Sequence, residues 1–75
     1  MKVYVAIYEH KHGRDVRVFK NKTSAEQWRE MIAEQWWEDE MRNVPMPSDP
    51  KRAANDYFER MSDREFFSVE EGRVE

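Results

Sequence analysis

The sequence predicts a small α+β domain of order ββααβ, with two helices packed on one face of a three-stranded antiparallel sheet. Two segments near the start are rich in β-branched and aromatic residues, the second of them alternates apolar and polar positions, and a glycine turn separates them. Two later segments carry apolar residues three and four positions apart, with prolines between them. Alternation with period two is typical of strands, and spacings of three and four are typical of helices. A chain of 75 residues has room for one such domain.

The hairpin predicted over residues 2–20 supplies the central strand of this sheet. Apolar residues occupy both sides of its first strand, with Val3, Val5 and Ile7 on one side and Tyr4, Ala6 and Tyr8 on the other. A strand that is apolar on both faces is favoured in the middle of a sheet, so the predicted spatial order is 2-1-3. The second strand alternates Val16 and Val18 with Arg17. We therefore expect its arginine-bearing side to form the free, solvated face of the sheet.

The first helix is expected over residues 24–41. Thr23 and Glu26 have the spacing of a capping box, in which two side chains satisfy free amide groups at a helix start. Apolar residues three and four positions apart predict a core-facing stripe along this helix. The stripe consists of Ala25, Trp28, Ile32 and Trp36.

Three prolines separate the two helices. Proline cannot continue a helix, but it suits the first position of a new one. Asp49 stands directly before Pro50, where its side chain can cap the second helix. The remaining segments are a Pro-rich linker over residues 43–49, a second helix over residues 50–61, a third strand over residues 65–69 and a frayed tail over residues 70–75.

Charge is distributed unevenly along the chain, although the net charge is only −3. Residues 1–22 hold six cationic side chains and two carboxylates, a net charge of +4. Residues 23–41 hold six carboxylates and one arginine, a net charge of −5. This asymmetry bears on the choice of partner rather than on the fold.

No catalytic, cofactor or metal site is expected, and the protein is predicted not to be an enzyme. The chain has no cysteine, which excludes disulfides and thiolate ligands. Its two glycines are too few for a phosphate-binding loop. His10 and His12 lie together at the hairpin turn, and a zinc site needs further ligands, so two surface histidines are expected.

A row of acids is the most unusual feature of the first helix. Glu26, Glu30, Glu34 and Glu38 are each four residues apart, on the side opposite the predicted core stripe. Like charges at this spacing destabilise a helix by about 0.2–0.5 kcal/mol per pair. The row is either a plain solvated face or a docking surface for a basic partner.

Trp37 and Met41 border this row, and two interpretations of them stay open. The second helix could cover both side chains, or they could form an exposed apolar anchor of the kind found at interface hot spots. On the second interpretation the protein binds a partner with a basic surface through this helix. The expected binding residues are Glu30, Glu34, Trp37, Glu38, Glu40 and Met41.

Two alternative functions remain. The basic hairpin could bind nucleic acid through Arg14, Arg17 and Lys20, although the negative net charge disfavours direct binding. The protein could also be a structural homo-oligomer, for example a homodimer, in which Trp37 and Met41 contact their symmetry mates.

In size and surface character the chain resembles small inhibitor proteins of phages and mobile elements, of the anti-CRISPR kind. The residues that carry the resemblance are Glu26, Glu30, Glu34, Glu38, Asp39 and Glu40, with Trp37 and Met41 beside them. The resemblance implies a non-enzymatic protein that blocks a nucleic-acid-handling host complex by docking this helix on it. The chain has no apolar run of 18 residues, which predicts a cytoplasmic protein without a membrane segment.

Overall fold

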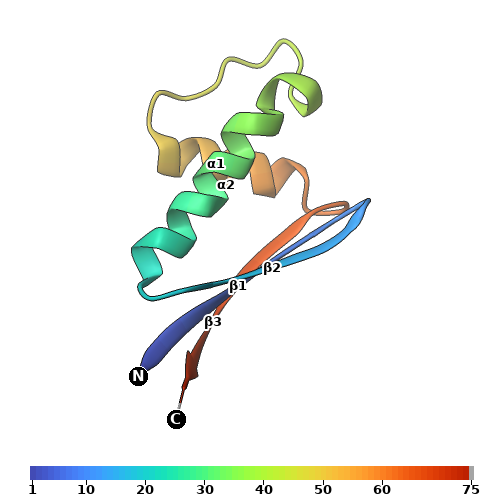
Figure 1. Cartoon of the computed structure of the whole chain (residues 1–75). Helices are drawn as coiled ribbons and strands as arrows, with labels where there is room; N and C mark the ends of the chain where they lie inside the picture. Colours follow the sequence, from blue (N-terminus) through green and yellow to red (C-terminus); the bar gives the residue numbers. More distant parts are fainter. Residues whose placement is uncertain (75) are drawn as a thin grey trace.

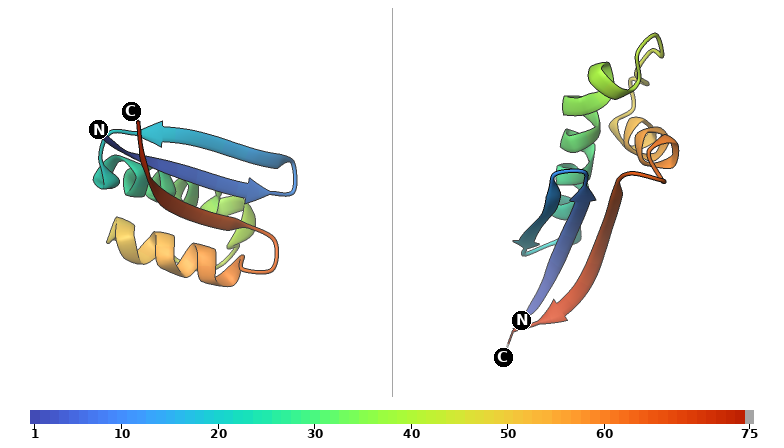
Figure 2. Two further views of the ribbon diagram at one scale, coloured as in Figure 1. Left: turned by 90° about the horizontal axis from the view of Figure 1, so that it is seen from below. Right: turned by 90° about the vertical axis from the view of Figure 1, so that its right-hand side faces the viewer.

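The fold of the protein is a three-stranded sheet covered on one face by two helices (Figures 1 and 2). The computed structural model describes residues 1–74. Its elements are β1 (Lys2–His10), β2 (Gly13–Phe19), α1 (Lys22–Glu40), α2 (Pro50–Arg60) and β3 (Phe66–Arg73). The strands are antiparallel in the order β2-β1-β3, which confirms the predicted α+β fold class and strand order.

The register of the sheet decides which side chains meet the helices. Ala6 on β1 lies between Arg17 on β2 and Val69 on β3. Directly opposed residues of antiparallel strands share a face. Ala6 is fully buried in the core, so its two neighbours also lie on the helix-covered face.

This register overturns the prediction that Arg17 would lie on the free face. The Arg17 guanidinium stacks over the ring of Trp28 on α1, with its Cζ 4.7 Å from the ring centroid. Val16 and Val18, the alternate residues of β2, therefore point away from the helices and are exposed. The physical reason is that Phe19, two residues after Arg17, packs on Trp28, and both residues must share one side of the strand.

A tight turn joins β1 to β2. His10 pairs with Gly13, and only residues 11 and 12 stand between the two strands. Gly13 has a φ of +132°, a conformation that side chains with a Cβ rarely adopt. The glycine thus sets the length of the hairpin.

The first helix begins at Lys22, two residues before its expected start. Asn21 is its N-cap: the backbone there is extended, and the side-chain oxygen accepts a 2.8 Å hydrogen bond from the Ser24 amide. The predicted capping box of Thr23 and Glu26 is therefore wrong. An amide oxygen at Asn21 reaches the third helical residue directly and fixes the earlier start.

Of the two adjacent tryptophans of α1, the buried one is Trp37, whose exposure the sequence left open. Trp37 is 6% exposed, whereas Trp36, predicted for the core stripe, is 38% exposed. The Trp37 indole Nε1 donates a 2.8 Å hydrogen bond to the Val44 carbonyl of the linker. The last turns of α1 extend past the sheet toward this linker (Figure 1). The buried positions of the helix therefore include Trp28 and Ile32 and then continue at Trp37, not at Trp36.

The C-terminal segments also differ from expectation. The side chain of Asp49 caps α2 by accepting from the Lys51 amide at 3.1 Å, and the helix ends at Arg60, one residue early. The third strand continues to Arg73, because β1 offers a pairing edge as far as Lys2. Most of the tail expected to fray is therefore strand, and residue 75 lies outside the described residues.

Candidate binding surfaces

The outward side of α1 carries unpaired acids. Glu34, Glu38 and Asp39 are exposed, and Glu30 and Glu40 are half-buried. Within residues 1–74, no ion pair uses a carboxylate of α1. The predicted row therefore forms no direct ion pair within the described residues, although the charges of Glu26 and Glu30 act on Arg29.

Arg29, in the middle of α1, is directed to α2 instead. Its Nη1 donates to the Asn55 side-chain oxygen at 2.8 Å, and its Cζ lies 5.0 Å from the centroid of the Phe58 ring. Burial lowers the pKa of Arg29, and the charges of Glu26 and Glu30 act in the opposite direction. The guanidinium is therefore used mainly to hold the two helices together.

Trp37 and Met41 do not form an exposed apolar anchor. Both are buried, with Met41 5% exposed. Only their edges reach an open hollow of about 350 Å³ at the end of α1, which residues 42–45 also line. The exposed apolar residues of α1 are Met31 and Trp36. The acidic residues of the predicted site thus share a surface, but the predicted anchor does not belong to it.

The basic residues of the hairpin are not brought together. Arg14 forms an ion pair with Glu9, its partner across the strands. Arg17 lies on the opposite face of β2 against Trp28. Lys20 is exposed just beyond the end of β2. Arg14 and Arg17 therefore lie on opposite faces of β2 and do not share one basic patch.

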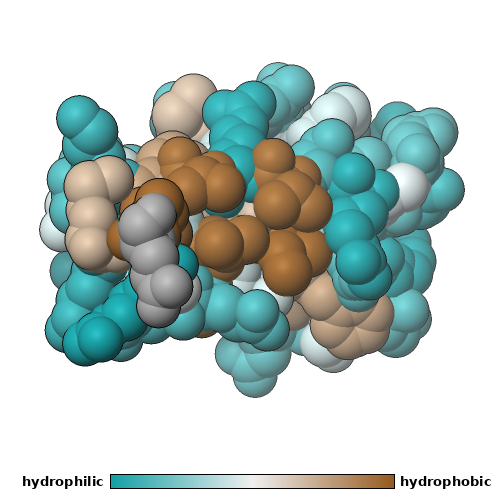
Figure 3. Space-filling view, turned by 60° about the horizontal axis from the view of Figure 1, so that its bottom comes forward, coloured by the Kyte–Doolittle hydropathy of each residue, from teal (hydrophilic) through white to brown (hydrophobic). Residues whose placement is uncertain are grey.

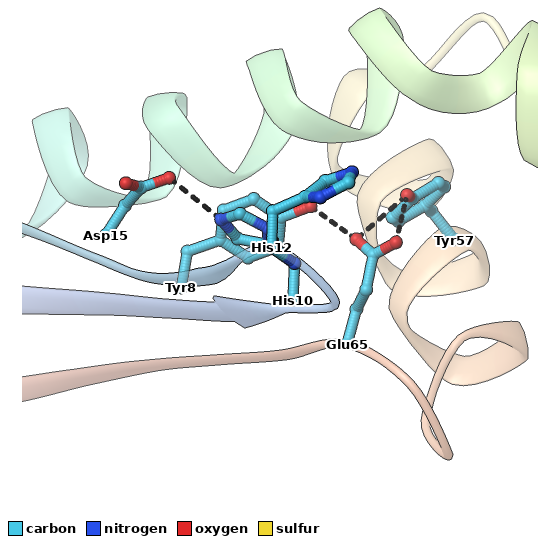
Figure 4. A network of polar contacts seen from close by, with 6 residues as sticks. All are labelled: Tyr8, His10, His12, Asp15, Tyr57 and Glu65. Atoms are coloured by element: carbon cyan, nitrogen blue, oxygen red, sulfur yellow. Dashed lines mark hydrogen bonds and ion pairs between the residues drawn. The ribbon is translucent and has the colours of Figure 1, made fainter.

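A polar network at the hairpin end joins residues that the sequence did not single out (Figure 4). The hydroxyls of Tyr8 on β1 and Tyr57 on α2 both donate to the carboxylate of Glu65, Tyr57 at 3.0 and 3.1 Å. Glu65 precedes β3, so the network fastens β1, α2 and the start of β3 to one another. Fifty-seven residues separate Glu65 from Tyr8, and no local pattern in the sequence marks such a pair.

The ring of His10 beside this network is held by hydrogen bonds. Its Nε2 lies 3.1 Å from the Asp15 carboxylate, and its Nδ1 accepts from the His12 amide at 3.2 Å. Both ring nitrogens of His10 therefore have a partner, which fixes the orientation of the ring. In the described part of the chain, no three side chains of metal-binding type are grouped so as to hold an ion.

The tyrosines of the network predict a loss of stability in alkali. Burial raises the pKa of both hydroxyls, and the hydrogen bond to Glu65 and its charge raise it further. Above pH ~10 an unfolded tyrosine loses its proton while the folded one keeps it, so stability is complete below pH ~10 and falls above it. The expected fall is up to about 1.4 kcal/mol per pH unit for each tyrosine.

Urea unfolding midpoints between pH 8 and pH 11 measure this effect. The double variant Tyr8→Phe/Tyr57→Phe should show a clearly shallower decline than the wild type over the same range. An identical decline in both proteins would assign the alkaline effect to other groups.

Comparison of the chain with protein-family models, with curated proteins and with solved structures finds no match in any of the three. Neither helix found in residues 1–74 is long and apolar enough to cross a membrane.

Proposed function

We propose that this protein is a non-enzymatic binding module that presents the acidic side of α1 to a basic surface of a partner protein. The observation that supports the proposal is the row of exposed and half-buried carboxylates along α1, which form no ion pair within residues 1–74. Glu30, Glu34 and Glu38 repel one another along the helix at a cost to its stability. A basic partner would remove this repulsion on binding.

The apolar part of this contact differs from the one expected from the sequence. Met31, between Glu30 and Glu34, is 62% exposed and replaces the buried Trp37 and Met41 as the apolar group of the acidic side. Carboxylates around a flexible apolar side chain steer a cationic partner and leave a small area to desolvate. Such a contact gives fast, salt-sensitive association.

The class of partner follows from the same charges. Proteins that handle nucleic acids expose basic channels, and carboxylates spaced about 6 Å apart along a helix can occupy sites made for phosphates. We propose that the protein inhibits such a complex in the manner of an anti-CRISPR protein. The separated hairpin cations support this function over direct nucleic-acid binding.

Affinity capture from a host lysate tests the proposal. We expect the variant Glu34→Lys/Glu38→Lys to capture at most about one tenth of the amount of partner that the wild type captures, because the variant reverses the charge of the contact. Raising the salt concentration should release the partner from the wild type. Captured proteins are identified by mass spectrometry.

A matched control separates the surface from the net charge. Glu59→Lys/Asp63→Lys changes the net charge equally at exposed positions outside α1. Partner capture by this variant should equal that of the wild type. Equal loss in both variants would mean that only the overall charge matters, and undiminished capture by Glu34→Lys/Glu38→Lys would overturn the proposal.

A further inference from the structure

The two helices leave an open cavity above β3. Phe67 and Val69 lie on the helix-covered face of this strand, where Val69 is level with the buried Ala6 and Phe67 packs on Trp28 with ring centroids 5.4 Å apart. Both side chains are nevertheless only half-buried. They form the apolar floor of a cavity of about 320 Å³, whose walls come from α1 and α2. The cavity is separate from the apolar side chains on the outer face of the sheet, which Figure 3 shows.

The wall from α1 carries three half-buried charged side chains, Glu26, Arg29 and Glu30. Glu26 lies three residues from Arg29 and four from Glu30, and these spacings place side chains on one side of a helix. No ion pair within residues 1–74 includes any of the three, and the two acids act on Arg29 without direct contact. The Nη1 of Arg29 donates to the Asn55 side chain. Its guanidinium has further donors, which suit a two-point contact with a carboxylate.

The wall from α2 adds a second cation. Lys51 stands in the first turn of α2, and Asn55 follows four residues later on the same side of the helix. Lys51 also forms no ion pair within the described part of the chain. The cavity therefore combines two cations, two carboxylates and an apolar floor, and none of these four charges has a direct partner of opposite sign.

This combination of charges selects the ligand. The two carboxylates repel a simple anion, and the two cations repel a simple cation. A molecule with one charge of each sign satisfies both pairs, and an apolar group on the same molecule covers the floor. Sites for small ligands measure about 300–1,000 Å³. A cavity of about 320 Å³ therefore suits a molecule at the small end of this range.

We propose that the cavity between α1, α2 and β3 binds a free α-amino acid with an apolar side chain. The carboxylate of the ligand binds the two cations, its ammonium group binds the two acids, and its side chain packs on the apolar floor. This inference is independent of the partner contact on α1. Glu34 and Glu38, whose reversal tests that contact, do not line the cavity. The failure of either proposal therefore leaves the other standing.

An NMR titration of the isotope-labelled chain with L-leucine tests the site. The backbone amides of Phe67 and Val69 and the side-chain amide of Asn55 are expected to shift as leucine binds, because they belong to the cavity lining. A ligand with about ten non-hydrogen atoms should have a dissociation constant on the order of 0.1–1 mM. No saturable shift up to about 20 mM leucine, or shifts confined to other parts of the molecule, would overturn the proposal.

Three analogues of leucine test the three parts of the contact. Isocaproic acid lacks the ammonium group, isoamylamine lacks the carboxylate, and glycine lacks the apolar side chain. Each analogue is expected to bind at least about tenfold more weakly than leucine. If isocaproic acid or isoamylamine binds as tightly as leucine, the ligand is not selected by two opposite charges. If glycine does so, the apolar floor has no part in binding.

Matched variants of the chain separate the cavity from the net charge. Lys51→Gln and Glu26→Gln are each expected to raise the dissociation constant at least about fivefold. Arg52→Gln and Glu34→Gln make the same changes at positions that do not line the cavity, and should bind leucine like the wild type. Lys51 is exposed, so its variant should keep the fold and decide the matter even if Glu26→Gln unfolds. Equal effects in the cavity variants and their controls would contradict the site.

Discussion

Replacing Trp37 with alanine is expected to lower the free energy of unfolding by about 3–5 kcal/mol. The indole is buried between α1 and the linker and donates a hydrogen bond to the Val44 carbonyl. Its removal leaves a cavity and an unpaired backbone acceptor. A domain of 75 residues has on the order of 4–11 kcal/mol of stability, so a large part of it should be lost. Urea unfolding followed by circular dichroism measures the change.

Trp36→Ala is the matched control, because it removes the same side chain from the neighbouring position. Because Trp36 is 38% exposed, its replacement should lower the free energy of unfolding by less than half as much as the replacement of Trp37. Equal losses from the two substitutions would contradict the assignment of Trp37, and not Trp36, to the core.

Replacing Glu65 with alanine is expected to cost about 2–4 kcal/mol of stability. Tyr57 is fully buried, and its hydroxyl donates only to Glu65, as does that of Tyr8. An unpaired buried hydroxyl costs about 1–3 kcal/mol, and the substitution creates two of them. Thermal unfolding at neutral pH gives the loss as a lower melting temperature.

A double-mutant cycle isolates the hydrogen bonds from the packing of Glu65. In a Tyr8→Phe/Tyr57→Phe background no hydroxyl remains to be left unpaired, so Glu65→Ala should cost much less there. Glu59→Ala, at an exposed position of α2, should have little effect in either background. The same cost in both backgrounds would mean that Glu65 stabilises the domain by other contacts.

The strand order could be predicted because it depends on one strongly patterned segment. The first strand is apolar on both sides, and such a strand is favoured in the middle of a sheet, where a neighbouring strand pairs with each of its two edges. The helices could be predicted from apolar spacing and from the proline-rich break between them. These signals are local and need no knowledge of distant contacts.

It was harder to predict which side of a helix or strand is buried than to predict the helix or strand itself. Trp36 and Trp37 are only 100° apart on the helix, and the burial of each depends on where the helix passes beyond the sheet. Alternation along β2 defined two sides but did not show which one meets the helices. Contacts of Phe19 and Arg17 with Trp28 decided it, and these contacts exist only in the folded chain.

The candidate binding surfaces could likewise be predicted only in part. The spacing of the acids along the helix placed Glu34 and Glu38 at the surface. The apolar anchor was misplaced, because Trp37 and Met41 belong to one buried cluster with residues of α2, and the Trp37 indole also donates to the linker. Glu65 carried no signal, since its two tyrosine partners come from β1 and α2.

The pairing of β1 with β3 has a consequence for synthesis on the ribosome. Lys2 pairs with Arg73, and the Val74 amide donates to the Met1 carbonyl at 2.9 Å, so the two ends of the described chain lie side by side. The hairpin and α1 can form as soon as they emerge, but one edge of β1 stays open until residues 66–73 follow. An apolar strand with an open edge can pair with other chains. Nascent copies are therefore exposed to mispairing until residues 66–73 have left the ribosome and paired with β1.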